Sequence, residues 1–195
     1  MLRTSTIQRQ TSETDIDLRI DLDGVGRCVS ETGIGFFDHI LTAFARHGHF
    51  DLNVRCKGDL HVDAHHTVED VGICLGAALA EAVGDKAGIR RFGSSYVPMD
   101  EALARAIVDL SGRPYLVYEM PMREETVGEF PTSLGLEFFR SVADHARCNL
   151  HIDLLRGTNA HHALEAGFKA AGRAFRQAVE IDPAESGIPS TKGVL

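Results

Sequence analysis

The chain has 195 residues, of which 44% are hydrophobic and 25% charged, a composition typical of a globular protein with a substantial core. The net charge of −8, without a basic run, argues against nucleic acid and anionic membrane surfaces as partners. The four cysteines show no CxxC spacing, and the sequence has neither a hydrophobic signal segment nor an apolar run of membrane-spanning length. These features predict a cytoplasmic protein with reduced cysteines.

The first half of the chain is expected to alternate strands and helices. Residues 1–13 are polar, and from Thr14 onward apolar residues alternate with charged ones, which predicts a strand. Asp23-Gly24 is typical of a tight turn, and the stretch 27–29 is expected to return as the hairpin partner of that strand. The next elements are predicted as a helix over 36–46, a strand over 52–56 and a long helix over 65–83.

The second half repeats this order after the stretch 85–98, which is expected to be a linker. We therefore predict an α+β fold, with a duplicated β-β-α-β-α half that forms two mixed sheets with packed helices. The expectation is one compact domain over 1–195, with pseudo-repeat halves at about 10–86 and 100–182. The second-half elements are predicted as a strand over 104–110, a returning strand over 115–120, a helix after Pro131, a strand over 150–154 and a helix over 161–179.

A pattern of five residues, HHxxE, opens both long predicted helices, once at His65–Glu69 and once at His161–Glu165. Chance would produce this pattern only about 0.03 times in a chain of this composition. On a helix the glutamate lies one turn beyond its histidines and can neighbour either imidazole. Adjacent residues diverge by about 100°, so each doublet is predicted to give one histidine to each of two metal ions.

Imidazole nitrogens with carboxylate oxygens, and no thiolate nearby, suit Mn, Fe or Zn in a site that keeps positions open for substrate. By the repeat, His39 of the first half corresponds to Glu137 of the second, and His47 corresponds to His145. Taken singly, His47 and His145 are expected to be surface or strand histidines rather than ligands, whereas the doublets differ because their spacing recurs.

Several cations are candidates for binding an anionic substrate. Lys169 lies on the same helical stripe as His161 and Glu165, and the matching position of the first half is Ile73. It is either an ordinary surface lysine or a cation that meets the substrate. The other candidate anion contacts are Arg91, Arg113, Ser190 and Lys192.

The residues alone leave functions of different classes open. One is a dinuclear metal-dependent hydrolase of a phosphate ester, because it would use the same histidines, glutamates and cations. Another is a metal-storage or structural assembly in which the histidines only bridge subunits.

The assembled motifs resemble those of the imidazoleglycerol-phosphate dehydratase family. The resemblance runs from about Thr4 to Leu195 and rests on GFFDHIL, DAHHTVEDVGICLG, PMDEALARAIVDLSGRP, NAHHALEAGFKA and PSTKGVL. It implies a fold like domain 2 of ribosomal protein S5 and a hydro-lyase of histidine biosynthesis. The implied reaction dehydrates D-erythro-imidazoleglycerol phosphate to imidazoleacetol phosphate. The resemblance also implies a homo-oligomer, a 24-mer, with sites at subunit contacts.

The resemblance further implies two manganese ions per subunit. One ion would take His39, His66, Glu69 and His161, and the other His65, His162, Glu165 and one more ligand. Many family members have a histidine at the position of Glu137. Because a carboxylate oxygen is an acceptable manganese ligand, we expect Glu137 to complete the second set, with His145 as the rival candidate.

The residues that would contact substrate by the resemblance are Glu13, His39, His65, Glu69, Arg91, Arg113, His161, Lys169, Ser190 and Lys192. The expected acid–base catalysts are Glu13, Glu69 and Glu165. Two ions that bind both nitrogens of the substrate imidazole would stabilise an imidazolate, whose electrons expel the neighbouring hydroxyl group. A carboxylate such as Glu13 would move the protons.

Overall fold

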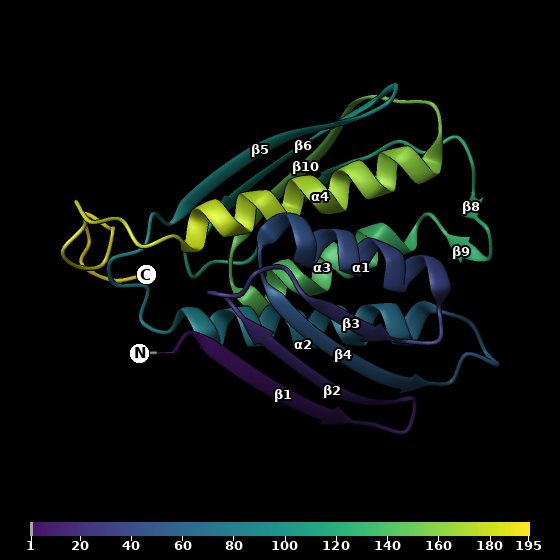
Figure 1. Cartoon of the computed structure of the whole chain (residues 1–195), viewed down its shortest axis with the longest axis horizontal. Coiled ribbons are helices and arrows are strands. Elements are labelled where there is room, and N and C mark those ends of the chain that lie inside the picture. The colour runs from purple at the N-terminus through teal and green to yellow at the C-terminus, as the bar shows by residue number, and fades with distance from the viewer. Residues whose placement is uncertain (1) are drawn as a thin grey trace.

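The computed structural model describes residues 2–195 and contains two four-stranded mixed sheets and four long helices (Figure 1). The predicted α+β class is confirmed. The first half consists of β1 (Thr4–Gln10), β2 (Thr14–Asp21), β3 (Cys28–Glu31), α1 (Gly35–Gly48), β4 (Asp51–Gly58) and α2 (His65–Val83). The second half consists of β5 (Phe92–Met99), β6 (Ala102–Asp109), β7 (Tyr115–Glu119), β8 (Thr126–Val127), β9 (Phe130–Pro131), α3 (Leu134–Ala146), β10 (Asn149–Arg156) and α4 (Ala160–Val179).

The two main sheets have the same topology. Their strand orders are β1-β2-β4-β3 and β5-β6-β10-β7, with two antiparallel pairs followed by one parallel pair in each. Each half therefore has the order β-β-β-α-β-α when the short β8–β9 hairpin is set aside, which is one strand more in each half than predicted.

The predicted hairpins of β2 with β3 and of β6 with β7 are wrong. β3 pairs in parallel with β4, and β7 pairs in parallel with β10. In the first half the cause is Asp51 at the start of β4. Its Oδ1 accepts hydrogen bonds from the backbone N–H groups of Val25 and Arg27, both at 2.9 Å, and this contact ties the turn to β4.

Two strands lie where no strand was predicted. β1 falls within the polar stretch 1–13, and β5 falls within the predicted linker 85–98. β1 is an edge strand whose outer positions are polar, so its pattern is weak. The inward face of β5 begins with Gly93 and Ser95, which do not register as hydrophobic. A Cβ on Gly93 would lie 1.9 Å from the Ala174 carbonyl oxygen, so α4 requires a bare backbone there.

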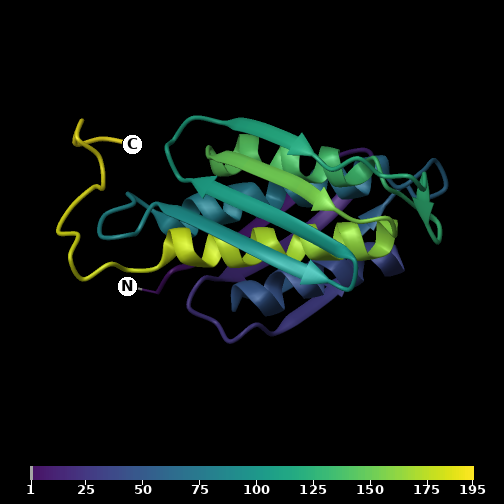
Figure 2. The same cartoon turned by 90° about the horizontal axis from the view of Figure 1, so that it is seen from above.

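The helices form two layers between the sheets (Figures 1 and 2). α1 and α2 cover the inner face of the first sheet, and α3 and α4 cover that of the second. Across the middle of the molecule, α2 packs against α3 and α1 packs against α4. The inward side chains of β2, such as Ile16, Leu18 and Ile20, are buried, while their neighbours are exposed. No helix of residues 2–195 is long and apolar enough to cross a membrane.

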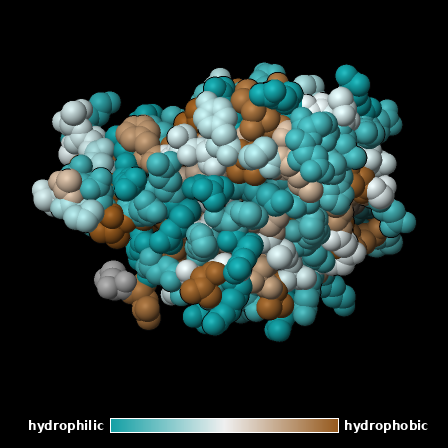
Figure 3. Space-filling model, turned by 45° about the horizontal axis from the view of Figure 1, so that its top comes forward, coloured by the Kyte–Doolittle hydropathy of each residue, from teal (hydrophilic) through white to brown (hydrophobic). Residues whose placement is uncertain are grey.

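The outer faces of the sheets differ in character. The first presents charged residues such as Asp15, Asp17 and Arg19. The second presents Phe92, Tyr96 and Tyr115, whose exposed fractions are 56%, 58% and 63%. Figure 3, which brings the top of the molecule forward, shows brown and pale areas interrupting a mainly hydrophilic surface.

The α2 and α4 helices begin at the same end of the molecule, which we call the histidine end because both doublets lie there (Figure 1). The chain beyond α4 lies at the opposite end, which we call the tail end. Figure 1 shows this last segment, which carries Ser190 and Lys192, projecting beyond the last turn of α4. Arg91 contacts it by donating to the Pro189 carbonyl, and Arg113 follows Gly112, where an added Cβ would lie 2.8 Å from Leu195.

Candidate active site

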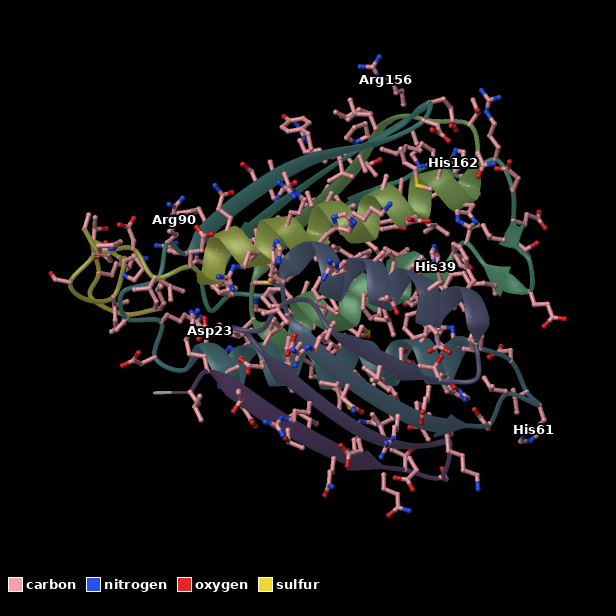
Figure 4. The ribbon with its side chains drawn as sticks, in the orientation of Figure 1. Asp23, His39, His61, Arg90, Arg156 and His162 are labelled. Carbon is pink, nitrogen blue, oxygen red and sulfur yellow. The ribbon has the colours of Figure 1, made fainter. Side chains whose placement is uncertain are left out.

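Three side chains from α1 and α4 converge at the histidine end. Glu165 Oε2 lies 2.8 Å from His39 Nε2 and 3.1 Å from His161 Nε2. Of residues 2–195, this is the only group of three or more histidine, cysteine, aspartate or glutamate side chains whose ligand atoms all lie within 4.8 Å of one another. Figure 4 shows His39 on the helix that faces α4. The predicted association of His39 with His161 is therefore present within one chain.

Glu165 is held as a carboxylate by its neighbours. Its other oxygen, Oε1, lies 2.6 Å from Lys169 Nζ. Burial alone would raise the pKa of Glu165, but the hydrogen bonds and positive charge of Lys169 and His39 outweigh it and lower the pKa to about 2. The stripe position of Lys169 thus places its cation on the clustered carboxylate.

The first doublet lies at the beginning of α2, and its two rings face different neighbours. The His65 and His66 ring planes are 89° apart, as the helical divergence predicts. His65 Nε2 lies 3.7 Å from Glu69 Oε2, which is too long for a hydrogen bond. His66 Nδ1 donates to Asp59 Oδ2 at 3.0 Å, and this hydrogen bond raises the pKa of His66. Glu13 faces the other nitrogen, His66 Nε2, at 3.8 Å.

The second doublet repeats this arrangement at the beginning of α4. The His161 and His162 ring planes are 84° apart. His162 Nδ1 donates to Glu101 Oε2 at 2.8 Å, and this contact raises the pKa of His162. The same hydrogen bond, with those from the backbone of Asn159 and Thr158, lowers the pKa of Glu101 to about 2. Sequence reasoning missed Asp59 and Glu101, because both come from loops outside the repeated pattern.

One chain brings together only part of each predicted ligand set. His39 and His161 meet Glu165, whereas the prediction grouped them with His66 and Glu69 of the other doublet. Glu137 lies 2.7 Å from Arg140 Nη1, and His145 Nδ1 donates to the Ser141 carbonyl at 2.9 Å. Both ligand sets and the choice between Glu137 and His145 therefore stay predictions.

The predicted phosphate contacts lie at the tail end. Arg91 binds Asp109 through two nitrogens, at 2.7 and 3.2 Å, and donates to the Pro189 carbonyl at 2.9 Å, so it anchors the tail. The Arg91 N–H donates to the Ala178 carbonyl at the last turn of α4. Since Ala178 follows His162 by 16 residues, the two ends are about 24 Å apart along the helix axis.

One of two surface hollows adjoins the clustered histidines, and the other lies toward the opposite ends of α1 and α4. One of about 430 Å³ is lined by Phe36 and Phe130, among others. The Phe36 ring packs against His161, with centroids 5.0 Å apart. Another of about 670 Å³ lies beside the last turns of α1 and α4 and is lined in part by His47 and Arg173.

The fold and this cluster define a duplicated α+β protein with an imidazole–carboxylate site at the ends of paired helices. Comparison with known proteins supplies the family. The family model described as imidazoleglycerol-phosphate dehydratase matches residues 32–175. The imidazoleglycerol-phosphate dehydratase of Gluconacetobacter diazotrophicus is 58% identical over 99% of this chain and 98% of its own length. That of Bordetella petrii is 55% identical over the full length of both chains.

Solved structures agree with the sequence relatives. The Staphylococcus aureus imidazoleglycerol-phosphate dehydratase is 42% identical, with a TM-score of 0.83 over 92% of this chain and 99% of that one. IGPD from Pyrococcus furiosus, solved in complex with (S)-C348, is 38% identical, with a TM-score of 0.85 over 97% of this chain and 100% of that one. The chain belongs to the imidazoleglycerol-phosphate dehydratase family, whose members are hydro-lyases of histidine biosynthesis.

Proposed function

We propose that the chain is a manganese-dependent enzyme that dehydrates D-erythro-imidazoleglycerol phosphate to imidazoleacetol phosphate. Family membership over the whole chain supports the reaction class. The observation that carries the rest of the proposal is the convergence of His39, His161 and Glu165 within 4.8 Å of one another.

The donor set fits a divalent metal ion of this type. Imidazole nitrogen and carboxylate oxygen are ligands that manganese accepts, and the pKa of Glu165, near 2, keeps its carboxylate ionised. The doublets hold their rings 84° to 89° apart, so each can serve two ions. We therefore infer two ions per subunit, held by His39, His65, His66, Glu69, Glu137, His161, His162 and Glu165.

Manganese bound there supplies positive charge close to the imidazole ring of the substrate. The chain's own residues then bind and move protons. Glu13 lies beside His66 with its side chain 50% exposed, so it is free to exchange a proton with substrate and water. Lys169 pairs with Glu165 and brings a positive charge close to the site, where it attracts an anionic substrate.

The predicted phosphate contacts require a second copy of the chain. About 24 Å of α4 separates Ala178, beside Arg91, from His162, and no side chain is long enough to bridge that distance. A substrate that touches both ends must therefore lie between the histidine end of one copy and the tail end of another. The exposed aromatic side chains on the outer face of the second sheet give a further surface for assembly. We infer a homo-oligomer, a 24-mer by the family resemblance, with sites at subunit contacts.

An assay of metal-free and metal-loaded protein tests this function. Purified protein should bind close to two equivalents of manganese and convert imidazoleglycerol phosphate to the acetol product, and chelation should abolish the activity. Release of inorganic phosphate in place of the acetol product would indicate the phosphate-ester hydrolase instead. Full activity with a single tightly bound equivalent would contradict the two-ion scheme.

A further inference from the structure

The second histidine of each doublet is held by a carboxylate from outside its helix. His66 Nδ1 donates to Asp59 Oδ2 at 3.0 Å, and His162 Nδ1 donates to Glu101 Oε2 at 2.8 Å. Asp59 follows β4, whereas Glu101 lies in the turn between β5 and β6. Two unrelated loops thus deliver the same contact to the same ring nitrogen in both halves.

We propose that Glu101 is a positioning residue that sets the tautomer and orientation of His162, and that Asp59 does the same for His66. This inference rests on the metal-dependent function proposed above and deepens it, because it identifies which side chains prepare the metal ligands.

The chemistry follows from the contact. An ionised carboxylate only accepts hydrogen bonds, so the proton of the neutral imidazole must sit on Nδ1. The lone pair is then on Nε2, the nitrogen available to a metal ion. Among residues 2–195, His162 Nε2 makes no comparably short contact with a carboxylate, since its neighbour Asp100 lies 3.7 Å away and has a side chain that is 78% exposed. Carboxylates in this position raise the basicity of a ligating histidine and fix its ring.

Glu101 also fixes the start of the helix that carries His162. Its Oε1 accepts hydrogen bonds from the backbone N–H groups of Thr158 at 3.0 Å and Asn159 at 2.8 Å. The Asn159 side chain in turn accepts from the His162 N–H at 3.1 Å and caps α4. One carboxylate therefore holds both the ring of His162 and the backbone on which it is mounted.

The variant Glu101→Gln separates these two roles. The amide oxygen is expected to keep the position of Oε1, because two backbone N–H groups donate there. The NH₂ group must then face His162 Nδ1 and donate to it, which moves the imidazole proton to Nε2 and blocks ligation. If Glu101 were only a cap for the loop before α4, this variant would behave like the unmodified chain.

The experiment is a titration of the assembled protein with Mn²⁺ against a chelator of known affinity, together with thermal unfolding of the metal-free protein. We expect Glu101→Gln to lower the affinity for one of the two manganese ions about 10- to 100-fold. Its metal-free unfolding temperature should stay close to that of the unmodified chain. Glu31→Gln, at a glutamate that pairs with Arg55 on the surface, is the matched control and should change neither readout.

Asp59→Ala provides a second arm that does not depend on a helix cap. In the described part of the chain Asp59 Oδ1 has no hydrogen-bond partner, so the substitution removes the contact with His66 and spares the backbone. Asp59→Ala should also lower the affinity of the protein for one manganese ion. Unchanged manganese affinity in both Glu101→Gln and Asp59→Ala would overturn the inference, while the proposed function would stand. Absence of manganese binding by the unmodified chain would instead refute the proposed function itself.

Discussion

The two HHxxE helix starts have the same local geometry but different surroundings. The Glu165 side chain is 9% exposed and contacts His39, His161 and Lys169, whereas the Glu69 side chain is 42% exposed and lies 3.7 Å from His65. The difference comes from the helix packed alongside. α1 brings His39 onto α4, but α3, which packs on α2, directs Glu137 to its own Arg140.

This contrast shows that the repeated pattern determines how a doublet diverges, while the partner helix determines whether its site is assembled within one chain. The second-half start gathers a carboxylate, two imidazoles and a cation. The first-half start leaves Glu69 partly exposed, with Ile73 in place of Lys169. In the proposed oligomer, another copy would complete this start.

The largest expected effect separates Glu165 from Glu69. Glu165→Gln should lower kcat/KM by about 10³-fold or more, because it removes charge at the ions. It should also destabilise the metal-free protein by about 1–3 kcal/mol, since the partly buried Lys169 loses its charged partner. Glu69→Gln should also impair activity but leave metal-free stability within about 0.5 kcal/mol. Steady-state kinetics and urea unfolding of metal-free protein measure both effects. Equal loss of metal-free stability in the two variants would refute the claim that Glu165 stabilises the metal-free protein more than Glu69 does.

The helix crossings that bring each pair together should also differ. Gly172 on α4 meets the Phe44 carbonyl of α1, and an added Cβ would lie 2.3 Å from it. Gly76 on α2 meets the Val142 carbonyl of α3, with a corresponding distance of 2.7 Å. Overpacking costs about 1–3 kcal/mol, so Gly172→Ala should lie near the top of that range and Gly76→Ala near the bottom. Denaturant midpoints at one protein concentration give the ranking, and the reverse order would show that α1 yields more easily than α3.

A smaller effect is expected at the tail end. If the tail binds the substrate phosphate, Lys192→Ala should raise KM about 10-fold, the size of one charged hydrogen bond, without changing manganese content. A chain that ends after Ile188 should lose activity more severely, because it also lacks Ser190. Kinetics with parallel metal analysis test this. Unaltered KM in both variants would exclude the tail from the site.

The smallest effect concerns acid stability of the metal-free protein. Because the pKa of Glu165 is lowered from 4.5 to about 2, its ionised form contributes stability that is fully present above pH 4.5. That contribution is lost as the pH falls from 4.5 toward 2. The unmodified chain should therefore lose about 1 kcal/mol more than Glu165→Gln across this window. Urea unfolding at several pH values measures the difference, and parallel pH profiles would show that Lys169 and His39 do not stabilise the carboxylate.

Much of the fold could be predicted because long helices carry a strong period. The helix predicted over 65–83 matches α2, whose bounds are His65–Val83. The sequence did not predict β5, because the first inward residues of the strand are Gly93 and Ser95. The close approach of α4 requires a small residue at Gly93, so the strand lacks a hydrophobic pattern there. The pairing of β3 with β4 was not predicted, because it depends on contacts of Asp51 with Val25 and Arg27, which lie far from it in the sequence.

The candidate site shows the same limit. Divergence of the doublet rings follows from helix geometry and was predicted. The contacts of Asp59 with His66 and of Glu101 with His162 depend on where loops end in space, and the local sequence carries no signal for that. The separation of the histidine end from the tail end likewise depends on how α4 lies in the fold, which the local sequence does not specify.

The proposed oligomer requires that two copies share one site, and complementation between two inactive variants tests this. Glu165→Gln disables the histidine end, and a chain that ends after Ile188 disables the tail end, so each variant alone should be nearly inactive. Co-expressed in equal amounts, the two should form mixed oligomers in which about one quarter of the sites pair two intact ends. Activity near that fraction of the unmodified enzyme, absent when separately assembled variants are mixed, is the predicted result. Mixed oligomers that stay as inactive as either variant would show that each site lies within a single chain.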